Sequence, residues 1–397
     1  MKKVLAHKIR IYPNNKAITY FVMCFGAARF AYNWGLDLCK KSLDKNIKVP
    51  SGYDLSKSLN AIKREQYPWM YEVSKWVIQK SVYNVAEAFQ RFFKKTSKFP
   101  RFKKRGVCRD SFYIGLNQFK VEGNRIRLPN IGWIRMSQDL RFSGRPLSVV
   151  VSRTAGKYFA SIQVEVEDSY IYPHICESQA SIGVDLGVKD LAVLSNGEKI
   201  SNPKVLGYYE RRLKRLQRQL SRKEKGSRNR FKAKFQLSRL HYRIRSIRHD
   251  YFHKMTSDLV ERFRLIGIED LNVSGMMKNH MLAKYIQDAS FYEVKRQLDY
   301  KSNLSGSEVI KVDRFYPSSK TCSVCGWKKE DLKLSDREWR CEGCGMVHDR
   351  DINAARNILK VAARQVETEN ACGDVVRLDP FLRNQRTSKK QEGGISC

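Results

Sequence analysis

Two Cys-x-x-Cys pairs constrain the fold of this chain more strongly than any other feature of its sequence. The pair "CSVC" covers residues 322–325, the pair "CEGC" covers residues 341–344, and fifteen residues separate them. Each pair turns two thiolates toward one ion, and two pairs supply the tetrahedral sulfur ligands of a structural zinc ion. Gly326 and Gly345 follow the pairs directly, where a tight knuckle needs backbone angles that favour glycine. The spacing predicts a zinc ribbon that holds Zn2+ through Cys322, Cys325, Cys341 and Cys344.

The other cysteines are scattered along the chain, and this pattern indicates the compartment. They are Cys24, Cys39, Cys108, Cys176, Cys372 and Cys397. Scattered thiols with one tight quartet suit a reducing cytosol and one metal site, in contrast to a framework of secreted disulfides. We therefore expect a cytoplasmic protein.

The charge of the chain indicates its most general partner. The 76 lysines and arginines outnumber the 40 aspartates and glutamates, which gives a net charge of +36. Such an excess attracts polyanions over long distances, and nucleic acid is the commonest polyanion that a protein meets. A membrane surface is the alternative, but the sequence has no apolar run of about 18 residues that could span a bilayer. Hydrophobic residues make up 42% of the chain, which is enough to build a packed core.

The most basic segment is predicted to form two helices. Between residues 211 and 248 there are sixteen lysines and arginines and one acidic residue, Glu224. Apolar residues recur every three or four positions on both sides of "RKEKGSRNR", which predicts a helical hairpin over residues 204–252 with an apolar seam. A solvated helix face is the alternative explanation of the charges. Because arginines without acidic partners repel one another, we favour phosphate binding. The candidates are Arg211, Arg215, Arg218 and Arg222.

The N-terminal part of the chain is predicted to be a β domain with a helical insert. The segment "VLAHKIRIYP" alternates like a strand that ends at Pro13. Helical periodicity follows from Ile18 to about residue 97, and a basic, proline-containing linker comes next. The chain from about residue 110 to 170 then contains short runs typical of β-strands. The helical segment is therefore expected to be inserted after the first strand of the β domain.

Three carboxylates stand where apolar runs end or a helix begins. Asp185 lies in "GVDLG", Glu269 ends "LIGIE", and Asp351 starts the helical pattern "DINAARNILKVAA". Each has an ordinary explanation, as a turn residue, a surface carboxylate at a strand end and a helix cap, respectively. The ribbon does not need His348 or Asp349 as ligands, because four thiolates already complete its ligand set. Together, the three carboxylates form the kind of oxygen-ligand set that holds two magnesium ions for phosphodiester hydrolysis.

Motifs along the chain resemble those of a known family. The segments "GVDLGVKDLAVLSNG", "IGIEDLNVSGM", "DRFYPSSKTCSVCG" and "CEGCGMVHDRDINAARNI" are similar to the successive RuvC and zinc-ribbon motifs of TnpB proteins. "KIRIYPNNKA", "ARFAYNWGL" and "FPRFKKRG" are similar to earlier parts of that family, so the resemblance spans residues 1–360. TnpB proteins are RNA-guided nucleases that are encoded by transposons and resemble the ancestors of type V CRISPR effectors.

The resemblance implies roles for the carboxylates and a set of partners. Asp185, Glu269 and Asp351 would be the catalytic ligands of two Mg2+ or Mn2+ ions. Asp351 is preferred to Asp349 because Asp-Ile-Asn matches the family's third motif, and Asp349 would then lie at the helix start or just outside the metal ligands. The implied partners are a transposon-derived guide RNA and double-stranded target DNA selected by base pairing. A prokaryotic protein that works on the nucleoid is expected.

In this family the N-terminal helical unit and the β (wedge) domain recognise a short DNA motif beside the target. Tyr53, Lys75 and Gln79 occupy corresponding positions, where Gln79 could contact an adenine edge and Lys75 a phosphate or base. Ordinary surface polarity is the alternative for all three. The basic linker adds Arg101, Lys103 and Lys104 as nucleic-acid-binding candidates.

The expected fold is a multidomain α+β architecture. A β wedge domain with an inserted helical domain precedes an RNase H-like RuvC domain with an inserted zinc ribbon. The expected boundaries are 1–15 for the first wedge strand, 16–106 for the helical recognition domain, 107–178 for the rest of the wedge, 179–320 for the RuvC-like domain, 321–346 for the ribbon, 347–364 for the C-terminal RuvC helix and 365–397 for a polar, disordered tail.

The resulting hypothesis is an RNA-guided endonuclease that cleaves DNA next to a short motif at a single RuvC site. An RNA-guided repressor that binds without cleaving is a second possibility, which the presence of all three carboxylates disfavours. A DNA transposase with an RNase H-like site is a third. A Holliday-junction resolvase is a fourth, and it should lack the long basic hairpin. The sequence is compatible with a monomer or a dimer.

Overall fold

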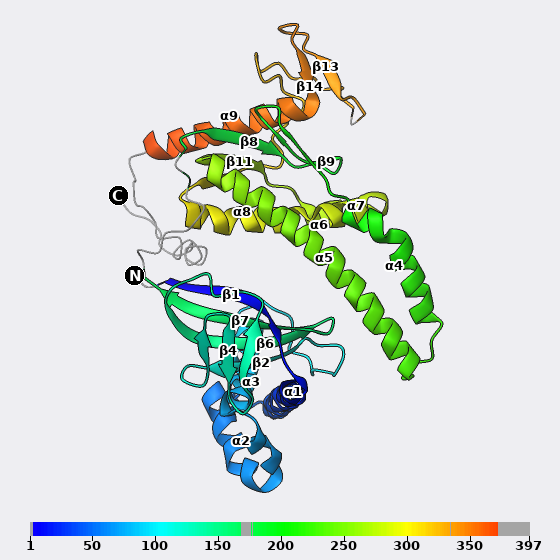
Figure 1. Cartoon of the computed structure of the whole chain (residues 1–397). Coiled ribbons are helices and arrows are strands. Elements are labelled where there is room, and N and C mark those ends of the chain that lie inside the picture. The colour runs from blue at the N-terminus through cyan, green and yellow to red at the C-terminus, as the bar shows by residue number, and fades with distance from the viewer. Residues whose placement is uncertain (1–2, 168–175, 177, 334, 372–397) are drawn as a thin grey trace. The chain divides into compact units, whose positions relative to one another are not determined.

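The computed structural model describes residues 3–167, 176, 178–333 and 335–371. They belong to two compact units, Met1–Tyr170 and Ile171–Cys397, and each unit is described by itself (Figure 1). Within these described ranges, every helix is too short or too polar to cross a membrane.

A seven-stranded sheet forms the framework of the first unit, in the order β2-β6-β7-β1-β5-β4-β3. β1 (Lys3–Tyr12) lies inside the sheet, antiparallel to both β7 (Lys157–Val166) and β5 (Gly132–Met136). Buried and exposed residues alternate along β1, as expected for a strand with one face on a core. The remaining strands are β2 (Asp110–Gly115), β3 (Lys120–Glu122), β4 (Arg125–Leu128) and β6 (Arg145–Thr154).

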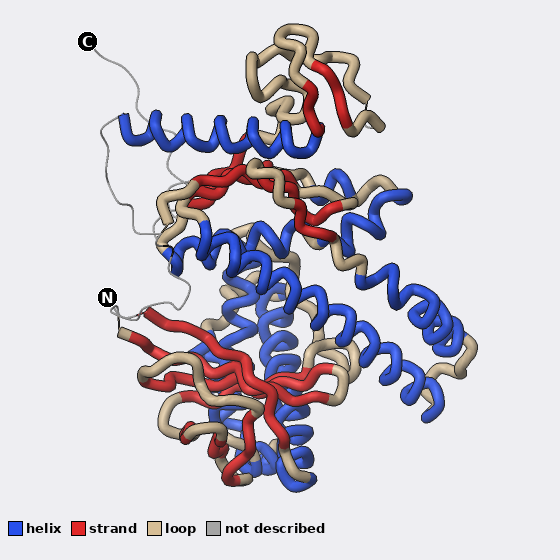
Figure 2. The backbone as a smooth tube through the Cα atoms, turned by 45° about the horizontal axis from the view of Figure 1, so that its top comes forward, coloured by secondary structure: helices blue, strands red, loops and turns tan. Residues whose placement is uncertain are grey.

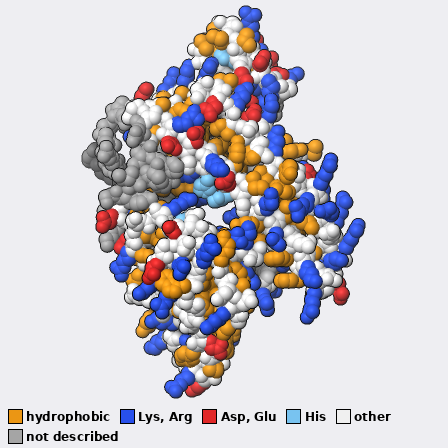
Figure 3. Space-filling model, in the orientation of Figure 1, with side chains coloured by type: hydrophobic (Ala, Val, Ile, Leu, Met, Phe, Trp, Pro, Cys, Tyr) orange, Lys and Arg blue, Asp and Glu red, His pale blue; other side chains and the backbone are white. Residues whose placement is uncertain are grey.

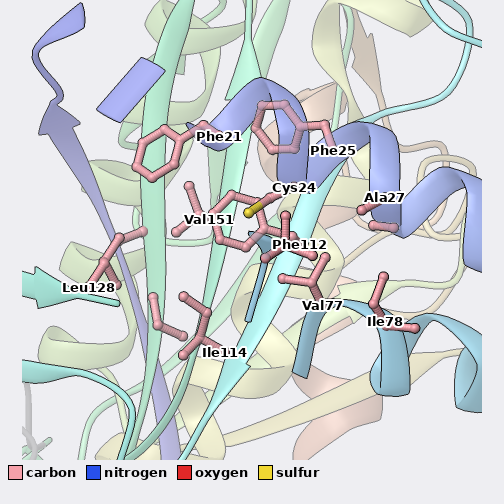
Figure 4. Close-up of a cluster of buried hydrophobic side chains, with 14 of the residues drawn as sticks. Phe21, Cys24, Phe25, Ala27, Val77, Ile78, Phe112, Ile114, Leu128 and Val151 are labelled. Carbon is pink, nitrogen blue, oxygen red and sulfur yellow. The ribbon is translucent and has the colours of Figure 1, made fainter. Parts of the chain in front are cut away.

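The chain between β1 and β2 is helical, in agreement with the periodicity of the sequence. It forms α1 (Asn15–Asp44), α2 (Gly52–Gln66), a 3-10 turn (Pro68–Glu72) and α3 (Lys75–Phe93). Asn14 begins α1 by accepting a hydrogen bond from the backbone N–H of Ala17. Phe21 and Phe25 of α1 pack against Phe112 of β2, each with a ring-centroid distance of 5.5 Å (Figure 4). The inserted helices and the sheet therefore share one core.

The second unit contains a five-stranded sheet in the order β10-β9-β8-β11-β12. β8 (Ser181–Asp185), β11 (Leu265–Glu269) and β12 (Glu308–Val312) are parallel to one another. β9 (Asp190–Leu194) and β10 (Lys199–Ser201) continue the sheet with antiparallel pairing. The C-terminal ends of the three parallel strands consequently meet at one edge of the sheet. Figure 2 shows the strands of this sheet as a layer between helices.

Helices cover both faces of this sheet (Figure 1). The buried isoleucines of β8 and β11 pack against α5 (Arg228–Arg262) and α8 (Phe291–Ser305), which contribute Phe252 and Phe291. Two shorter helices, α6 (Val273–Met276) and α7 (His280–Ala289), connect β11 to α8. The opposite face carries α9 (Arg350–Ala371), with Ile358 and Ala362 against Val312 of β12.

Two predicted boundaries differ from the structure. α9 continues to Ala371, so residues 365–371 are helical and do not belong to a polar tail. The rest of the predicted tail lies outside the described residues. The basic hairpin is formed by α4 (Val205–Ser221) and α5, whose seam includes Leu216 and Leu240. However, α5 extends to Arg262 and past the predicted end at 252, because its last turns bury Phe252, Met255 and Leu259 against the sheet.

The segment between β12 and α9 contains the four cysteines and two short strands. β13 (Glu338–Arg340) and β14 (Val347–Asp349) pair antiparallel. Trp339 and Leu332 pack with Cys322 and Cys341 in a small core of their own. β14 ends at Asp349 and α9 begins at Arg350, so no linker separates this segment from the helix.

Candidate carboxylate site and cysteine cluster

Asp185 and Glu269 occupy the last positions of neighbouring parallel strands. The register pairs Gly183 with Gly267 and Val184 with Ile268, so Asp185 and Glu269 come next in the same register. Adjacent strands lie about 4.8 Å apart, and paired residues of parallel strands point to the same face. The topology therefore brings two carboxylates from distant parts of the sequence side by side at one edge of the sheet.

Gly183 and Gly267 allow α9 to lie unusually close to this face of the sheet. Both precede the carboxylates by two positions, so they share the face to which the carboxylates point. A Cβ atom on Gly183 would overlap the carbonyl oxygen of Ala355 and lie 2.7 Å from the backbone nitrogen of Leu359. A Cβ atom on Gly267 would lie 2.8 Å from the Cβ atom of Ala362. Only a residue without a side chain leaves room for the helix at either position.

The close approach of α9 brings a third carboxylate to the strand ends. Asp351 lies one helical turn before Ala355, the residue that covers Gly183. Burial and the negative charges of Glu269 and Asp351 raise the pKa of Asp185 to about 7, and Arg350 opposes this shift. Burial also raises the pKa of Glu269. The three carboxylates that the sequence analysis selected therefore lie in one electrostatic neighbourhood.

Two cations near Glu269 are paired with another carboxylate. Lys295 and Arg314 bind Asp270 at 2.6 and 2.5 Å. Among the described residues, no lysine or arginine forms an ion pair with Asp185 or Glu269 within 4.0 Å. A partly buried carboxylate without a cationic partner is costly. Asp185 and Glu269 therefore fit an oxygen-coordinated divalent cation.

Arg337 contacts Asp351 from the cysteine-containing segment. The distance from its Nη1 atom to Oδ2 of Asp351 is 3.3 Å. Its backbone carbonyl also accepts a hydrogen bond of 2.8 Å from the N–H of Arg350. Arg337 could not be predicted from the sequence, because nothing in its sequence neighbourhood separates it from other basic residues. Gly183 and Gly267 were missed too, although a glycine two positions before each carboxylate was a visible signal.

Asp349 immediately precedes α9 and caps the start of this helix. This agrees with one of the two positions predicted for Asp349. Its Oδ1 atom accepts hydrogen bonds from the N–H groups of Asp351 and Ile352 at 3.0 and 3.1 Å. Its other oxygen binds Lys199 at 2.7 Å. Burial opposes ionisation, but Lys199 and the two backbone donors outweigh it and lower the pKa of Asp349. With its oxygens thus engaged, Asp349 supports the turn that carries Asp351.

The four predicted cysteines form one cluster. Their sulfur atoms all lie within 4.8 Å of one another, and no other described group of three or more His, Cys, Asp or Glu residues is as tight. The separations of 3.7 Å for Cys322–Cys344 and 3.5 Å for Cys325–Cys341 match the roughly 3.8 Å edge of a tetrahedron with Zn–S bonds of about 2.3 Å. The cluster is therefore compatible with zinc.

The backbone around the cysteines has the geometry of two equivalent knuckles. Gly326 and Gly345 have φ values of +81° and +73°, which confirms the expected need for glycine. In each knuckle the glycine N–H donates to the carbonyl of the first cysteine, at 3.0 and 2.8 Å. Burial opposes ionisation of Cys322, but backbone donors and His348 outweigh it and lower the pKa of its thiol to about 6. The Nε2 atom of His348 lies 3.0 Å from this sulfur.

The predicted nucleic-acid-binding residues are distributed over both units. Arg211, Arg215, Arg218 and Arg222 are exposed at three- and four-residue spacing, so they follow one side of α4. On the face that Figure 3 shows, many lysine and arginine side chains lie on this hairpin among hydrophobic ones. Exposed aromatic rings accompany them, with Tyr208 at 82% and Phe231 at 72% exposure.

The candidates in the first unit differ in accessibility. Tyr53 on α2 and Lys75 on α3 are exposed, and Gln79 lies one turn after Lys75 on the same side of α3. In the linker, Arg101 and Lys104 are exposed. Lys103 is different, because its ammonium lies 3.7 Å from the centre of the Tyr32 ring and is partly buried. It is the least accessible residue of the linker set.

The fold and the site define the class of the protein. A solved structure described as "Cryo-EM structure of the Cas12f1-sgRNA-target DNA complex" matches with a TM-score of 0.54 and 16% identity, over 86% of this chain and 82% of that chain. A family model described as "Cas12f1-like, TNB domain" matches residues 291–358, which include the cysteine cluster. The chain therefore has the mixed α/β fold of Cas12-type proteins.

Sequence relatives identify the family within that class. A Streptomyces pristinaespiralis protein named "Putative RNA-guided DNA endonuclease" is 37% identical over 98% of this chain and 96% of its own length. An Escherichia coli protein with the same description, InsQ, is 34% identical over 98% and 99%. "TnpB-like protein L79" of a mimivirus is 37% identical over 32% of this chain and 25% of its own length. The chain belongs to the TnpB family.

Two further family models match the N-terminal and central parts of the chain. One, described as "Probable transposase", matches residues 161–280. The other, described as "Helix-turn-helix domain", matches residues 1–48. In the structure, residues 3–48 contain β1 and the single long helix α1, so this part is one strand and one helix.

Proposed function

We propose that this protein is an RNA-guided DNA endonuclease that hydrolyses phosphodiester bonds at one carboxylate site. The observation that carries the proposal is the shared register of Asp185 and Glu269 at the edge to which α9 brings Asp351. Two relatives that match almost the whole chain bear the name of RNA-guided DNA endonucleases. The order of the sheet, in which β9 alone runs antiparallel to the other four strands, supports an RNase H-like, RuvC-type assignment for the second unit.

The three carboxylates are proposed to hold two Mg2+ or Mn2+ ions. Such ions supply an activated water and stabilise the leaving 3′-oxygen of a phosphodiester. The protein's part is to fix the ligands and to leave them without ion-pair partners. Asp270 contributes to the latter, because it forms the ion pairs with Lys295 and Arg314 beside Glu269. Arg337, beside Asp351, can donate a charge-assisted hydrogen bond to a phosphate oxygen.

The basic surface is proposed to bind a transposon-derived guide RNA and its duplex with target DNA. The arginine row of α4 offers positive charge at successive turns to a phosphate backbone. Tyr208 and Phe231, exposed beside it, can stack on unpaired bases. In the first unit, we assign the seven-stranded sheet as the wedge domain and α1–α3 as the recognition domain for a DNA motif beside the target. The cysteine cluster is proposed to hold structural Zn2+.

Expression together with the native flanking DNA tests the proposal. We expect a discrete structured RNA to co-purify, and the complex to cleave matching double-stranded DNA in Mg2+. Asp185→Ala should abolish cleavage and leave RNA binding intact. Asp258→Ala, which removes an exposed carboxylate of α5, should cleave DNA as the native protein does. Cleavage by Asp185→Ala would refute the site. Heterogeneous RNA would favour a transposase, and guided binding without cleavage by the native protein would favour a repressor.

A further inference from the structure

Three polar side chains of α9 face the first cysteine knuckle. Asn353, Asn357 and Lys360 follow one another at four- and three-residue spacing, so they share one side of the helix. Asn353 and Asn357 are only 1% and 2% exposed. A buried amide side chain is costly unless its hydrogen bonds are made. The hydrogen-bond partners of these side chains therefore identify the segment that this side of α9 binds.

These side chains bind the backbone of the first knuckle and of the segment that leads into it. Asn353 accepts a hydrogen bond from the N–H of Ser323 at 2.8 Å and donates to the carbonyl of Thr321 at 2.7 Å. Asn357 donates to the carbonyls of Ser318 and Thr321 at 2.8 and 2.6 Å. Lys360 donates to the carbonyl of Ser323, which lies between the two cysteines of the pair. The contacts to Ser323 lie inside the cysteine pair, and those to Ser318 and Thr321 lie just before Cys322.

The second part of the ribbon holds the same helix at its N-terminus. Arg350 donates its N–H to the carbonyl of Arg337 at 2.8 Å, and the side chain of Arg337 contacts Asp351 at 3.3 Å. Glu338 pairs with Asp349 in the β13–β14 ladder. The first two turns of α9, which carry Asp351, are thus bound by the ribbon on one side and by the sheet glycines on the other.

We propose that Asn353, Asn357 and Lys360 are positioning residues, through which the closed cysteine cluster sets the place of Asp351 relative to Asp185 and Glu269. The inference rests on the proposed nuclease function and adds a dependence of its metal site on zinc. When zinc does not hold the thiolates together, the knuckle loses the metal–sulfur bonds that order it. Asn353 and Asn357 then lose their partners, and the start of α9 loses one of its two supports.

The coupling has a thermodynamic consequence that is independent of cleavage. If zinc favours binding of a divalent cation at the carboxylates, that cation must favour zinc binding by the same factor. Manganese is a suitable probe, because it prefers oxygen ligands and its binding is measurable by electron paramagnetic resonance. Manganese bound at the carboxylates is defined as the part that Asp185→Asn abolishes.

The test uses the full chain without RNA. The variants are Asn353→Ala with Asn357→Ala, the milder Lys360→Met, the conservative Lys360→Arg, and Gln365→Ala as an exposed control on the same helix. We expect the double variant to retain its four-cysteine zinc content and to bind Mn2+ at least tenfold more weakly. Lys360→Met should weaken Mn2+ binding less, and Lys360→Arg and Gln365→Ala should bind it as the native protein does.

A second measurement keeps the inference testable if the double variant does not fold. Zinc is removed from the native protein with a chelator, the chelator is dialysed away, and Mn2+ affinity is measured before and after zinc is restored. A tenfold loss that zinc restores supports the coupling. Unchanged Mn2+ affinity in the zinc-free protein, or in a folded double variant, overturns it. A native protein that binds Mn2+ but does not cleave DNA would instead refute the proposed function alone.

Discussion

The substitution Gly183→Ala should disturb the assembly of the carboxylate site without preventing the chain from folding. The backbone at Gly183 lies outside the left-handed region, so alanine is compatible with its conformation and the effect is purely steric. The added Cβ atom would overlap the carbonyl oxygen of Ala355 and lie 2.7 Å from the nitrogen of Leu359. Because such atoms need about 3.5 Å, α9 must move away from β8 by roughly 1 Å.

The magnitude of the effect follows from this displacement. Overpacking of this kind costs about 1–3 kcal/mol, which for a unit of this size lowers the melting temperature by about 2–4 °C per kcal/mol. The protein should therefore stay folded at 25 °C. Catalysis is more sensitive, because a shift of about 1 Å at a reacting centre costs roughly 100-fold in rate. Asp351 moves with the helix, so cleavage should fall by about that factor while guide RNA remains bound.

Single-turnover cleavage, RNA binding and thermal melting measure the three expectations. Gly207→Ala is the matched control, since its Cβ atom on α4 would meet nothing within 4 Å. Gly267→Ala should show a smaller loss than Gly183→Ala, because its closest neighbour is the Ala362 side chain and not the helix backbone. If Gly183→Ala melts below the native protein but cleaves at the native rate, the position of α9 does not control the site and the reasoning is refuted.

Two further predictions concern charge. The raised pKa of Asp185, about 7, means that the metal-free folded protein binds more protons than the unfolded chain between about pH 4 and 7, so its stability should fall as pH rises through this window. Melting curves at pH 5–8 should show this slope in the native protein and its loss in Asp185→Asn, and equal slopes would contradict the assignment. Replacing Arg211, Arg215, Arg218 and Arg222 by alanine should reduce the slope of log Kd for guide RNA against log salt by about 3, as the loss of four phosphate contacts requires. An unchanged slope in filter-binding titrations would show that this side of α4 does not contact RNA.

Local patterns in the sequence were sufficient for several parts of this protein. The Cys-x-x-Cys spacing and the glycines after each pair predicted the cluster, because a knuckle is made by residues that are neighbours in the chain. Alternation and helical periodicity located β1, the inserted helices and the basic hairpin for the same reason. The net charge indicated nucleic acid as a partner, because net charge is the sum of the side-chain charges and does not depend on the fold.

Tertiary structure decided how these parts combine. The sequence indicated Asp185, Glu269 and Asp351 as one candidate ligand set, but it did not show how elements so far apart in the chain meet. The register of β8 with β11 and the approach of α9 supply that arrangement. The contacts of Arg337 and Asn353 could not be predicted from the sequence for a similar reason, since their partners lie on other elements. The extension of α5 to Arg262 depends on the sheet against which its last turns pack. Short-range patterns specify the elements, whereas contacts between residues distant in the chain specify the site, because strand register and helix packing are properties of the whole core.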